Sequence, residues 1–144
     1  MVTPCGSEAP EQVAVELTSG TMRLGNWPCK LAENSFAYRA YGSREIHERH
    51  RHRYEFNREY EERLKAAGLR ITGETPDGTY VEICELADHP WFLGCQFHPE
   101  FKSKPMEPHP LFKAFVGASY EYRRRRLTPV LADAEPEEMY SRGD

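Results

Sequence analysis

The 144-residue sequence has no long hydrophobic run and no large excess of charge of either sign. No apolar stretch approaches the roughly 20 residues that are needed to span a bilayer. Residues 1–6 show neither the basic start nor the apolar stretch of a secretory signal. Because 19 Lys+Arg stand against 23 Asp+Glu, the net charge is only -4. We therefore expect a cytoplasmic protein with no membrane partner and no nucleic-acid partner.

Cysteine is scarce, and its spacing excludes the usual cysteine motifs. Cys5, Cys29, Cys84 and Cys95 form no C-x-x-C pair and no recognisable disulfide framework. Cys84 and Cys95 lie in apolar runs that are typical of strands. Buried free thiols in a reducing cytosol are the simplest interpretation.

The composition is polar for a globular domain, with 39% hydrophobic and 29% charged residues. A core of ordinary size is expected only if both ends of the chain stay outside it. Residues 1–16 show no periodicity, and the end of the chain is acidic and contains proline. We predict a loose leader at 1–16, a folded part at 17–120 and a charged, disordered tail at 121–144.

Two helices are predicted. Asn57 can cap a helix that runs to Ala67, and Gly68 is suited to end it. A second helix covers residues 111 to about 122, after Pro110 at the first helical position. Four arginines follow it. They either complement the negative end of the helix or bind phosphate.

Extended segments account for most of the rest. Short pieces at 21–24 and 29–31 are followed by predicted strands at 69–72 and 80–86, with a turn between the two strands. Residues 91–97 form a nearly continuous apolar run. Such a run predicts a strand that is covered on both faces.

Two residues that could carry chemistry follow that last strand. His98 and Glu100 stand two apart, so their side chains project to the same side of an extended segment. Pro99 fixes φ and is expected to keep the segment from forming a helix. A carboxylate beside an imidazole orients the ring, as in a nucleophile–base–acid relay. The alternative is a surface pair at a turn, but sites in α/β proteins gather where strands end.

Residues 47–55 hold three histidines interleaved with arginines. No metal is expected, because the arginines repel a cation and no Cys or Asp completes a ligand set nearby. Interleaved arginines suit the binding of carboxylates or phosphates. The other interpretation is a solvated basic loop that pairs with Glu45, Glu48 and Glu55.

Four blocks of the sequence carry a family resemblance: Gly20–Gly25 (GTMRLG), Glu48–Asn57 (ERHRHRYEFN), His89–Phe101 (HPWFLGCQFHPEF) and His109–Phe112 (HPLF). Through these blocks the chain resembles the CTP synthase family, with similarity from about residue 17 to 119. The His-Pro-Glu motif in the third block is shared by class I (triad-type) glutamine amidotransferases generally, and the first two blocks narrow the resemblance to CTP synthase. The second block has phenylalanine at position 56 where the family has valine.

The resemblance implies an α/β fold for residues 17–120. This part would be the C-terminal portion of a class I glutamine amidotransferase (flavodoxin-like) domain, a sheet with flanking helices. It also implies that His98 is the general base that activates a cysteine, that Glu100 orients His98, and that Arg53 contacts glutamine. The family passes ammonia to a synthetase domain that aminates UTP to CTP with ATP and magnesium. ATP, magnesium and UTP are therefore expected only there, as is the homo-oligomer interface, and this chain is expected to hold no cofactor.

The sequence departs from the family in one respect that bears on activity. The family's nucleophile lies in a Gly-x-Cys-x-Gly elbow upstream of the first block, and none of the four cysteines has that setting. Without a thiolate His98 has nothing to activate, so this chain alone is expected to be inactive. We expect a piece of a CTP synthase. The alternative is a non-catalytic module that binds a synthetase or a small carboxylate through Arg53, although such a module has no use for His98 and Glu100.

Overall fold

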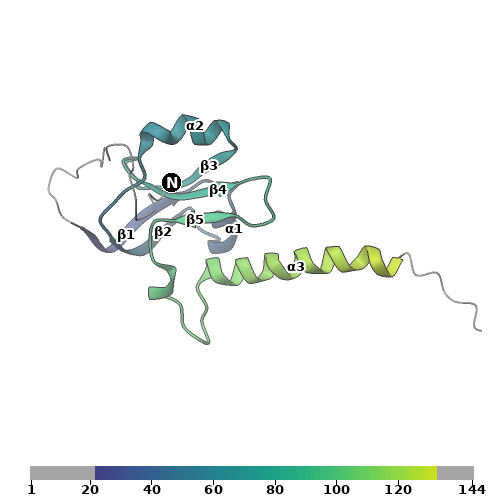
Figure 1. Ribbon diagram of the computed structural model, residues 1–144. Helices are drawn as coiled ribbons and strands as arrows, with labels where there is room; N and C mark the ends of the chain where they lie inside the picture. The colour runs from purple at the N-terminus through teal and green to yellow at the C-terminus, as the bar shows by residue number, and fades with distance from the viewer. Residues whose placement is uncertain (1–21, 133–144) are drawn as a thin grey trace, which may run out of the picture.

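The computed structural model describes residues 22–132, with side chains to residue 127. Five antiparallel strands form one sheet in the order β2-β1-β3-β4-β5, with three helices beside it (Figure 1). The sheet is curled, since the His98 N–H just after β5 donates to the Arg49 C=O of β2, at the opposite edge, over 2.9 Å. The strands are β1 (Arg23–Leu31), β2 (Glu45–His52), β3 (Leu69–Glu74), β4 (Val81–Leu86) and β5 (Leu93–Cys95).

Strand β2 covers most of the histidine- and arginine-rich stretch. The interpretation of this stretch as a solvated loop is therefore wrong. Ile46, Glu48 and His50 are buried, while the side chains between them are exposed. This alternation is the period of two that a strand with one covered face requires. Because Glu48 and His50 on the covered face are polar, the sequence of β2 does not show the alternation of apolar and polar residues that would have predicted the strand.

The connection between β1 and β2 contains α1 (Phe36–Tyr41), which was not predicted. Ser35 caps it, because its Oγ accepts the Tyr38 N–H at 2.9 Å. Gly42 ends it in the left-handed conformation, with φ 69°. Six residues are too few to show a helical period, so only these capping residues could have indicated the helix.

The first predicted helix and the two strands after it are confirmed. Asn57 accepts the Glu59 N–H at 2.9 Å and begins a 3-10 turn over Arg58–Tyr60. Helix α2 (Glu61–Ala66) follows directly, and Gly68, with φ 93°, ends the segment before β3. Strands β3 and β4 then form an antiparallel hairpin.

The prediction of a strand over 91–97 that is covered on both faces is wrong in length and in burial. β5 comprises only Leu93–Cys95 and lies at an edge of the sheet of residues 22–132. The Phe92 side chain is 44% exposed, and Phe97 alone of the run is fully buried. The run is apolar because it borders the core at one end, not because two layers cover it along its length.

Helix α3 (Pro110–Ala132) begins beside α1 and then projects away from the sheet (Figure 1). It begins at Pro110 as predicted but ends at Ala132 rather than near Tyr122. The four arginines at 123–126 therefore lie inside the helix and not at its end, and the helix extends into the tail expected at 121–144 as far as Ala132. The leader at 1–16 and the rest of the tail lie outside the described residues. Within 22–132, no helix is long and apolar enough to cross a membrane.

The core is small and lies between the covered face of the sheet and α1. Its centre is Ile83 of β4 and Cys29 of β1, both fully buried. Leu111 ties the first turn of α3 to this cluster, whereas the rest of α3 reaches past it. The buried members are Cys29, Leu31, Ala37, Ile46, Ile83, Phe97 and Leu111.

Candidate active site

His98 and Glu100 form the pair that the sequence predicted. His98 Nδ1 lies 2.7 Å from Glu100 Oε1, and the Phe101 ring stacks on the imidazole with centroids 4.7 Å apart. Since Glu100 accepts the Nδ1 proton, Nε2 keeps its lone pair and is free to act as a base. The hydrogen bond also lowers the pKa of Glu100, so its carboxylate is charged at neutral pH.

The backbone that presents this pair differs from the prediction. Pro99 does not keep the segment extended, because Pro99–Phe101 forms a 3-10 turn. Proline at the first position of a helical turn has the φ that the turn needs and no N–H to leave unpaired. The turn brings Glu100 round beside His98. The side chains of His98 and Glu100 are 34% and 56% exposed, so the pair is open to a reactant.

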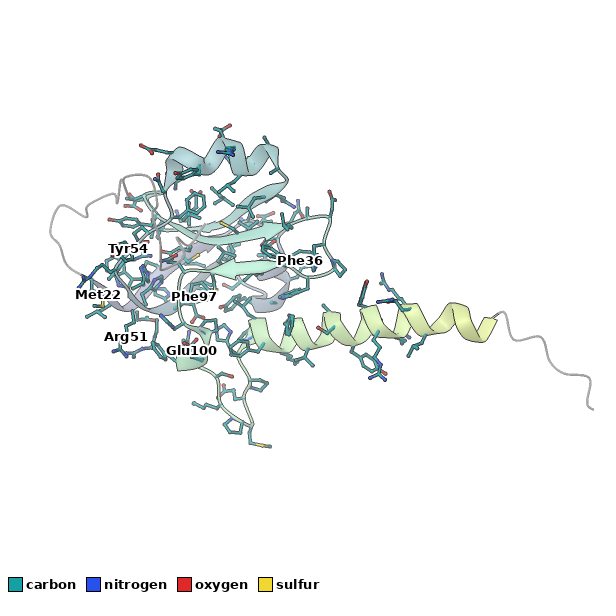
Figure 2. The ribbon with its side chains drawn as sticks, in the orientation of Figure 1. Met22, Phe36, Arg51, Tyr54, Phe97 and Glu100 are labelled. Atoms are coloured by element: carbon teal, nitrogen blue, oxygen red, sulfur yellow. The ribbon has the colours of Figure 1, made fainter. Side chains whose placement is uncertain are left out.

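Arg53 follows β2 directly, and its side chain is exposed. It makes no hydrogen bond or ion pair with any residue in 22–132. Its neighbour Tyr54 is joined to the strand that leads to His98, because Gln96 Nε2 donates to the Tyr54 C=O at 2.6 Å. Figure 2 shows Tyr54, Phe97 and Glu100 at the end of the sheet away from Phe36. The structure thus brings the segments of Arg53 and His98 to one end of the molecule.

Two of the three histidines of β2, His50 and His52, point inward, where the sequence suggested a surface cluster, whereas His47 is exposed. His50 Nδ1 lies 2.8 Å from His52 Nε2. Burial, aided by the nearby Arg23 charge, lowers the pKa of His50 to about 3 and that of His52 to about 4. Both rings are therefore neutral at pH 7. In the described part of the chain, no three potential ligands come together to hold a metal ion.

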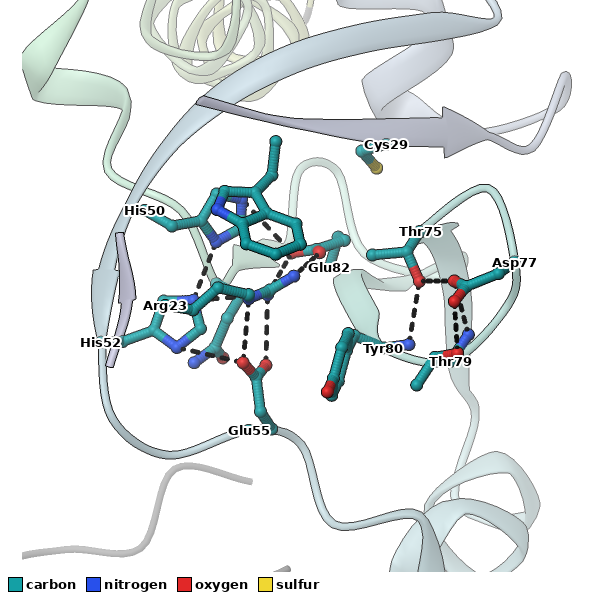
Figure 3. Close-up of polar contacts among 12 residues, drawn as sticks. Arg23, Cys29, His50, His52, Glu55, Thr75, Asp77, Thr79, Tyr80 and Glu82 are labelled. Carbon is teal, nitrogen blue, oxygen red and sulfur yellow. Dashed lines mark hydrogen bonds and ion pairs between the residues drawn. The ribbon is translucent and has the colours of Figure 1, made fainter. Parts of the chain in front are cut away.

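Arg23 is the centre of a buried ionic group that the sequence analysis missed. We call Arg23, Glu55 and Glu82 the Arg23 cluster (Figure 3). Arg23 Nη1 donates to Glu82 Oε1 at 2.6 Å, and Nη2 donates to Glu82 Oε2 at 3.1 Å. On its other side Arg23 Nε lies 2.9 Å from Glu55 Oε1. The Tyr80 ring covers the guanidinium at 4.8 Å.

The Arg23 cluster places two carboxyl groups beside one guanidinium in a buried position. Burial raises the pKa of Glu55 to about 7, against the lowering effect of Arg23. Burial likewise raises the pKa of Glu82. One guanidinium thus holds two carboxylates that resist ionisation. A signal was present in the sequence, namely an arginine in the apolar start of a strand, but its partners lie 32 and 59 residues away.

A third buried carboxylate, that of Glu48, links the elements around the His98–Glu100 pair. Glu48 Oε1 accepts from the Tyr41 hydroxyl at 2.9 Å and from Lys102 Nζ at 3.2 Å, and it lies 3.1 Å from His109 Nε2. Burial alone would raise the pKa of Glu48, but these hydrogen bonds outweigh it and lower the pKa. Glu48 therefore fixes the turn after His98 and the start of α3 to β2.

None of the described cysteines is suited to be a nucleophile. Cys29 is fully buried, and burial raises the pKa of its thiol. Burial raises the pKa of Cys95 to about 12 and also raises that of Cys84. All three thiols therefore stay protonated at neutral pH. Cys5 lies outside the described residues.

The domain combines a curled antiparallel sheet, flanking helices and an exposed His98–Glu100 pair just beyond the edge strand β5. This combination is typical of a glutamine amidotransferase domain of the triad type. The chain matches the family model of Glutamine amidotransferase class-I over residues 4–118, and it belongs to that family. Within the family it resembles CTP synthase. The resemblance and the fold class expected from the sequence are both confirmed.

The curated relatives that this chain matches are much longer than the chain. It is 70% identical over 114 residues to the CTP synthase of Koribacter versatilis, covering 78% of this chain and 20% of that protein. It is 65% identical over 117 residues to the CTP synthase of Syntrophus aciditrophicus, covering 81% of this chain and 22% of that protein. The chain thus spans about a fifth of the length of these curated relatives.

Solved structures agree with the fold. The glutaminase domain of Trypanosoma brucei CTPS with bound acivicin matches with a TM-score of 0.66 and 39% identity, over 70% of this chain and 40% of that one. A putative GMP synthase protein from Thermoplasma acidophilum matches with a TM-score of 0.54, over 74% of this chain and 48% of that one. The second, at 17% identity, supports the fold alone.

Proposed function

We propose that this chain supplies the base and the substrate-holding arginine for glutamine hydrolysis in a CTP synthase. The observation that supports this most directly is the His98–Glu100 pair, with 2.7 Å between Nδ1 and Oε1, in a chain that belongs to the class I family. His98 Nε2 takes the proton of a cysteine thiol, and the thiolate attacks the carboxamide carbon of glutamine. His98 then gives the proton to the departing ammonia. A water molecule, deprotonated by the same nitrogen, attacks the thioester and releases glutamate.

The nucleophile in this proposal comes from outside residues 22–132. Burial holds Cys29, Cys84 and Cys95 in the thiol form, so none of them supplies the thiolate at neutral pH. The ammonia would pass to a synthetase domain that aminates UTP to CTP with ATP and magnesium. Those ligands bind that domain, and the part of the enzyme represented here binds glutamine.

Arg53 is the proposed contact for the substrate carboxylate, and its loss is expected to weaken glutamine binding. A bidentate guanidinium–carboxylate contact is among the stronger hydrogen bonds, so Arg53→Ala should raise the glutamine KM by about 10- to 100-fold. The assay enzyme is a chimaera in which residues 22–118 replace the matching segment of the Koribacter versatilis relative. CTP formation is measured with glutamine and, separately, with ammonia.

The matched control is Arg51→Ala. Arg51 is also exposed and lies two residues earlier, at the end of β2. This variant should leave the glutamine KM within about twofold, because the proposed contact with the substrate carboxylate is made by Arg53 and not by Arg51. Ammonia-dependent activity should be unchanged in both variants. An equal KM rise in Arg51→Ala would show that general charge matters rather than a contact, and would contradict the assigned role of Arg53.

The chain on its own is expected to associate. β5 leaves one edge of the sheet unpaired within residues 22–132, and α3 exposes apolar side chains along its length. Light scattering after size exclusion should give a mass above that of one chain. Changing Phe115 and Val116 to glutamate together should lower that mass. A monomer that unfolds cooperatively would contradict the expectation. Up to residue 127, the large exposed apolar residues of α3 are Phe112, Phe115, Val116, Tyr120, Tyr122 and Leu127.

A further inference from the structure

The backbone directly after Arg53 is held from three directions. The Tyr54 C=O accepts from Gln96 Nε2 at 2.6 Å and lies 3.1 Å from His52 Nδ1. The next residue, Glu55, pairs with Arg23 at 2.9 Å. Arg53 itself extends from this fixed backbone without a partner among residues 22–132. Its position is therefore set by its neighbours and not by contacts of its own side chain.

The same contacts lead back to the segment between β5 and His98. The Gln96 N–H donates to the Glu82 C=O at 2.9 Å, and the Glu82 side chain holds Arg23. His98 lies two residues after Gln96. The contacts thus form a closed ring, whose members in order are Gln96, Tyr54, Glu55, Arg23 and Glu82.

Within this ring the Gln96 side chain is the shortest link between the two proposed functional residues. Outside the ring, the His98 N–H also donates to the Arg49 C=O of β2 at 2.9 Å. The side chain of Gln96 connects the end of β5 to the Tyr54 carbonyl, and every other path between Arg53 and His98 in the ring passes through the Arg23 cluster. Gln96 is half-buried, and its backbone already belongs to the sheet through Glu82. The Gln96 side chain therefore extends from a fixed backbone and sets the distance between that backbone and the Tyr54 carbonyl.

We propose that Gln96 is a positioning residue for glutamine binding, because its amide holds Arg53 at a set place relative to His98. This role rests on the proposed amidotransferase function. In the absence of the Gln96 donor, the Tyr54 carbonyl keeps only its contact with His52, and the segment of Arg53 gains freedom. Glutamine must then order that segment when it binds, and this ordering costs affinity.

Gln96→Met tests the role, since methionine keeps the length and volume of the side chain but cannot donate. In the chimaeric CTP synthase we expect the glutamine KM to rise about tenfold, the size of one lost hydrogen bond. The glutamine kcat and the ammonia-dependent rate should stay within about twofold. A variant that merely folds less well would instead lose kcat at an unchanged KM. Arg63→Met, on the exposed face of α2, is the matched control and should change neither constant.

A double-mutant cycle with Arg53 separates this role from general support of the fold. If Gln96 acts through Arg53, then Gln96→Met adds less than about twofold to the KM once Arg53 is alanine. Full additivity of the two changes would overturn the proposal. Gln96→Glu is a second test. A carboxylate that faces the Tyr54 carbonyl cannot donate to it, so this variant should raise the glutamine KM at least as much as Gln96→Met does. A KM unchanged in both Gln96 variants would also overturn it.

The outcomes distinguish this inference from the function on which it rests. If Arg53→Ala leaves the glutamine KM unchanged, the proposed function of Arg53 fails, and the role of Gln96 fails with it. If Arg53→Ala raises the KM and Gln96→Met does not, the proposed function stands and only the positioning role is wrong.

Discussion

Replacing His98 with alanine is expected to abolish glutamine-dependent CTP formation and to leave ammonia-dependent formation unchanged. General base catalysis by a positioned histidine contributes about 100- to 10,000-fold, and loss of one member of a relay removes most of what the relay achieves. Glutamine-dependent kcat/KM should therefore fall by at least about a thousandfold. Ammonia supplied directly does not need the thiolate, so its use is the measure of an intact synthetase.

The physical reason lies in which nitrogen of His98 is free. Glu100 accepts the Nδ1 proton at 2.7 Å, and this leaves the Nε2 lone pair for the thiol. Alanine leaves the thiol protonated and removes the group that returns a proton to the leaving ammonia. Glu100→Gln should cost less, because its amide oxygen can still accept from Nδ1 although it no longer stabilises a charged ring.

His47→Ala is the matched control for His98→Ala. His47 is an exposed histidine on the outer face of β2, and its backbone carbonyl, which the substitution keeps, accepts from Lys102 Nζ. Both activities should survive in this variant. If His98→Ala lowered the glutamine and ammonia activities together, the base role would be wrong and the effect would be one of folding.

The sequence predicted the parts of the molecule in which side-chain type and backbone geometry agree. Asn57 and Gly68 marked the ends of the segment of α2, and Pro110 marked the start of α3. The His98–Glu100 pair was predicted because both members lie within three residues, where local geometry alone brings them together. Even there the predicted backbone conformation was wrong, because Pro99 begins a 3-10 turn instead of holding the chain extended.

The sequence did not predict the buried polar contacts between residues that are far apart in the chain. β2 buries Glu48 and His50, which a hydrophobic pattern cannot assign to the covered face. Glu48 accepts a hydrogen bond from Tyr41 of α1 and lies against His109 before α3, and these partners are 7 and 61 residues away in the sequence. The Arg23 cluster was missed for the same reason. The polar core becomes predictable only when the pairing of β1 with β2 and the place of β4 in the sheet are known.

Arg23→Met is expected to cost about 3–5 kcal/mol in the free energy of unfolding. The substitution keeps most of the side-chain volume but leaves Glu55 and Glu82 buried without a cation. Arg23 is 4% exposed, and the Glu82 side chain is fully buried, so water cannot replace the lost contacts. Pulse proteolysis in urea at low protein concentration measures this loss without interference from association.

Arg49→Met is the matched control, since Arg49 is an exposed arginine of β2 whose side chain is not part of the core. It should change the free energy of unfolding by less than about 0.5 kcal/mol. Adding Glu55→Gln and Glu82→Gln to Arg23→Met should recover part of the loss, because neutral amides cost less to bury than carboxylates. Equal losses for Arg23→Met and Arg49→Met would show that the Arg23 cluster does not stabilise the sheet.

The loss caused by Arg23→Met should depend on pH in a defined direction. The pKa of Glu55 in the folded protein is raised to about 7, above an unfolded value of 4.5, and removal of Arg23 raises it further. A raised carboxyl pKa means that the folded state binds the proton more tightly, so stability is greatest below about pH 4.5 and falls as the pH rises through 7. The variant should therefore lie closest to the unchanged protein at pH 5 and furthest from it at pH 8. A difference that stayed constant over this range would show that Glu55 and Glu82 do not become unpaired buried charges when Arg23 is lost.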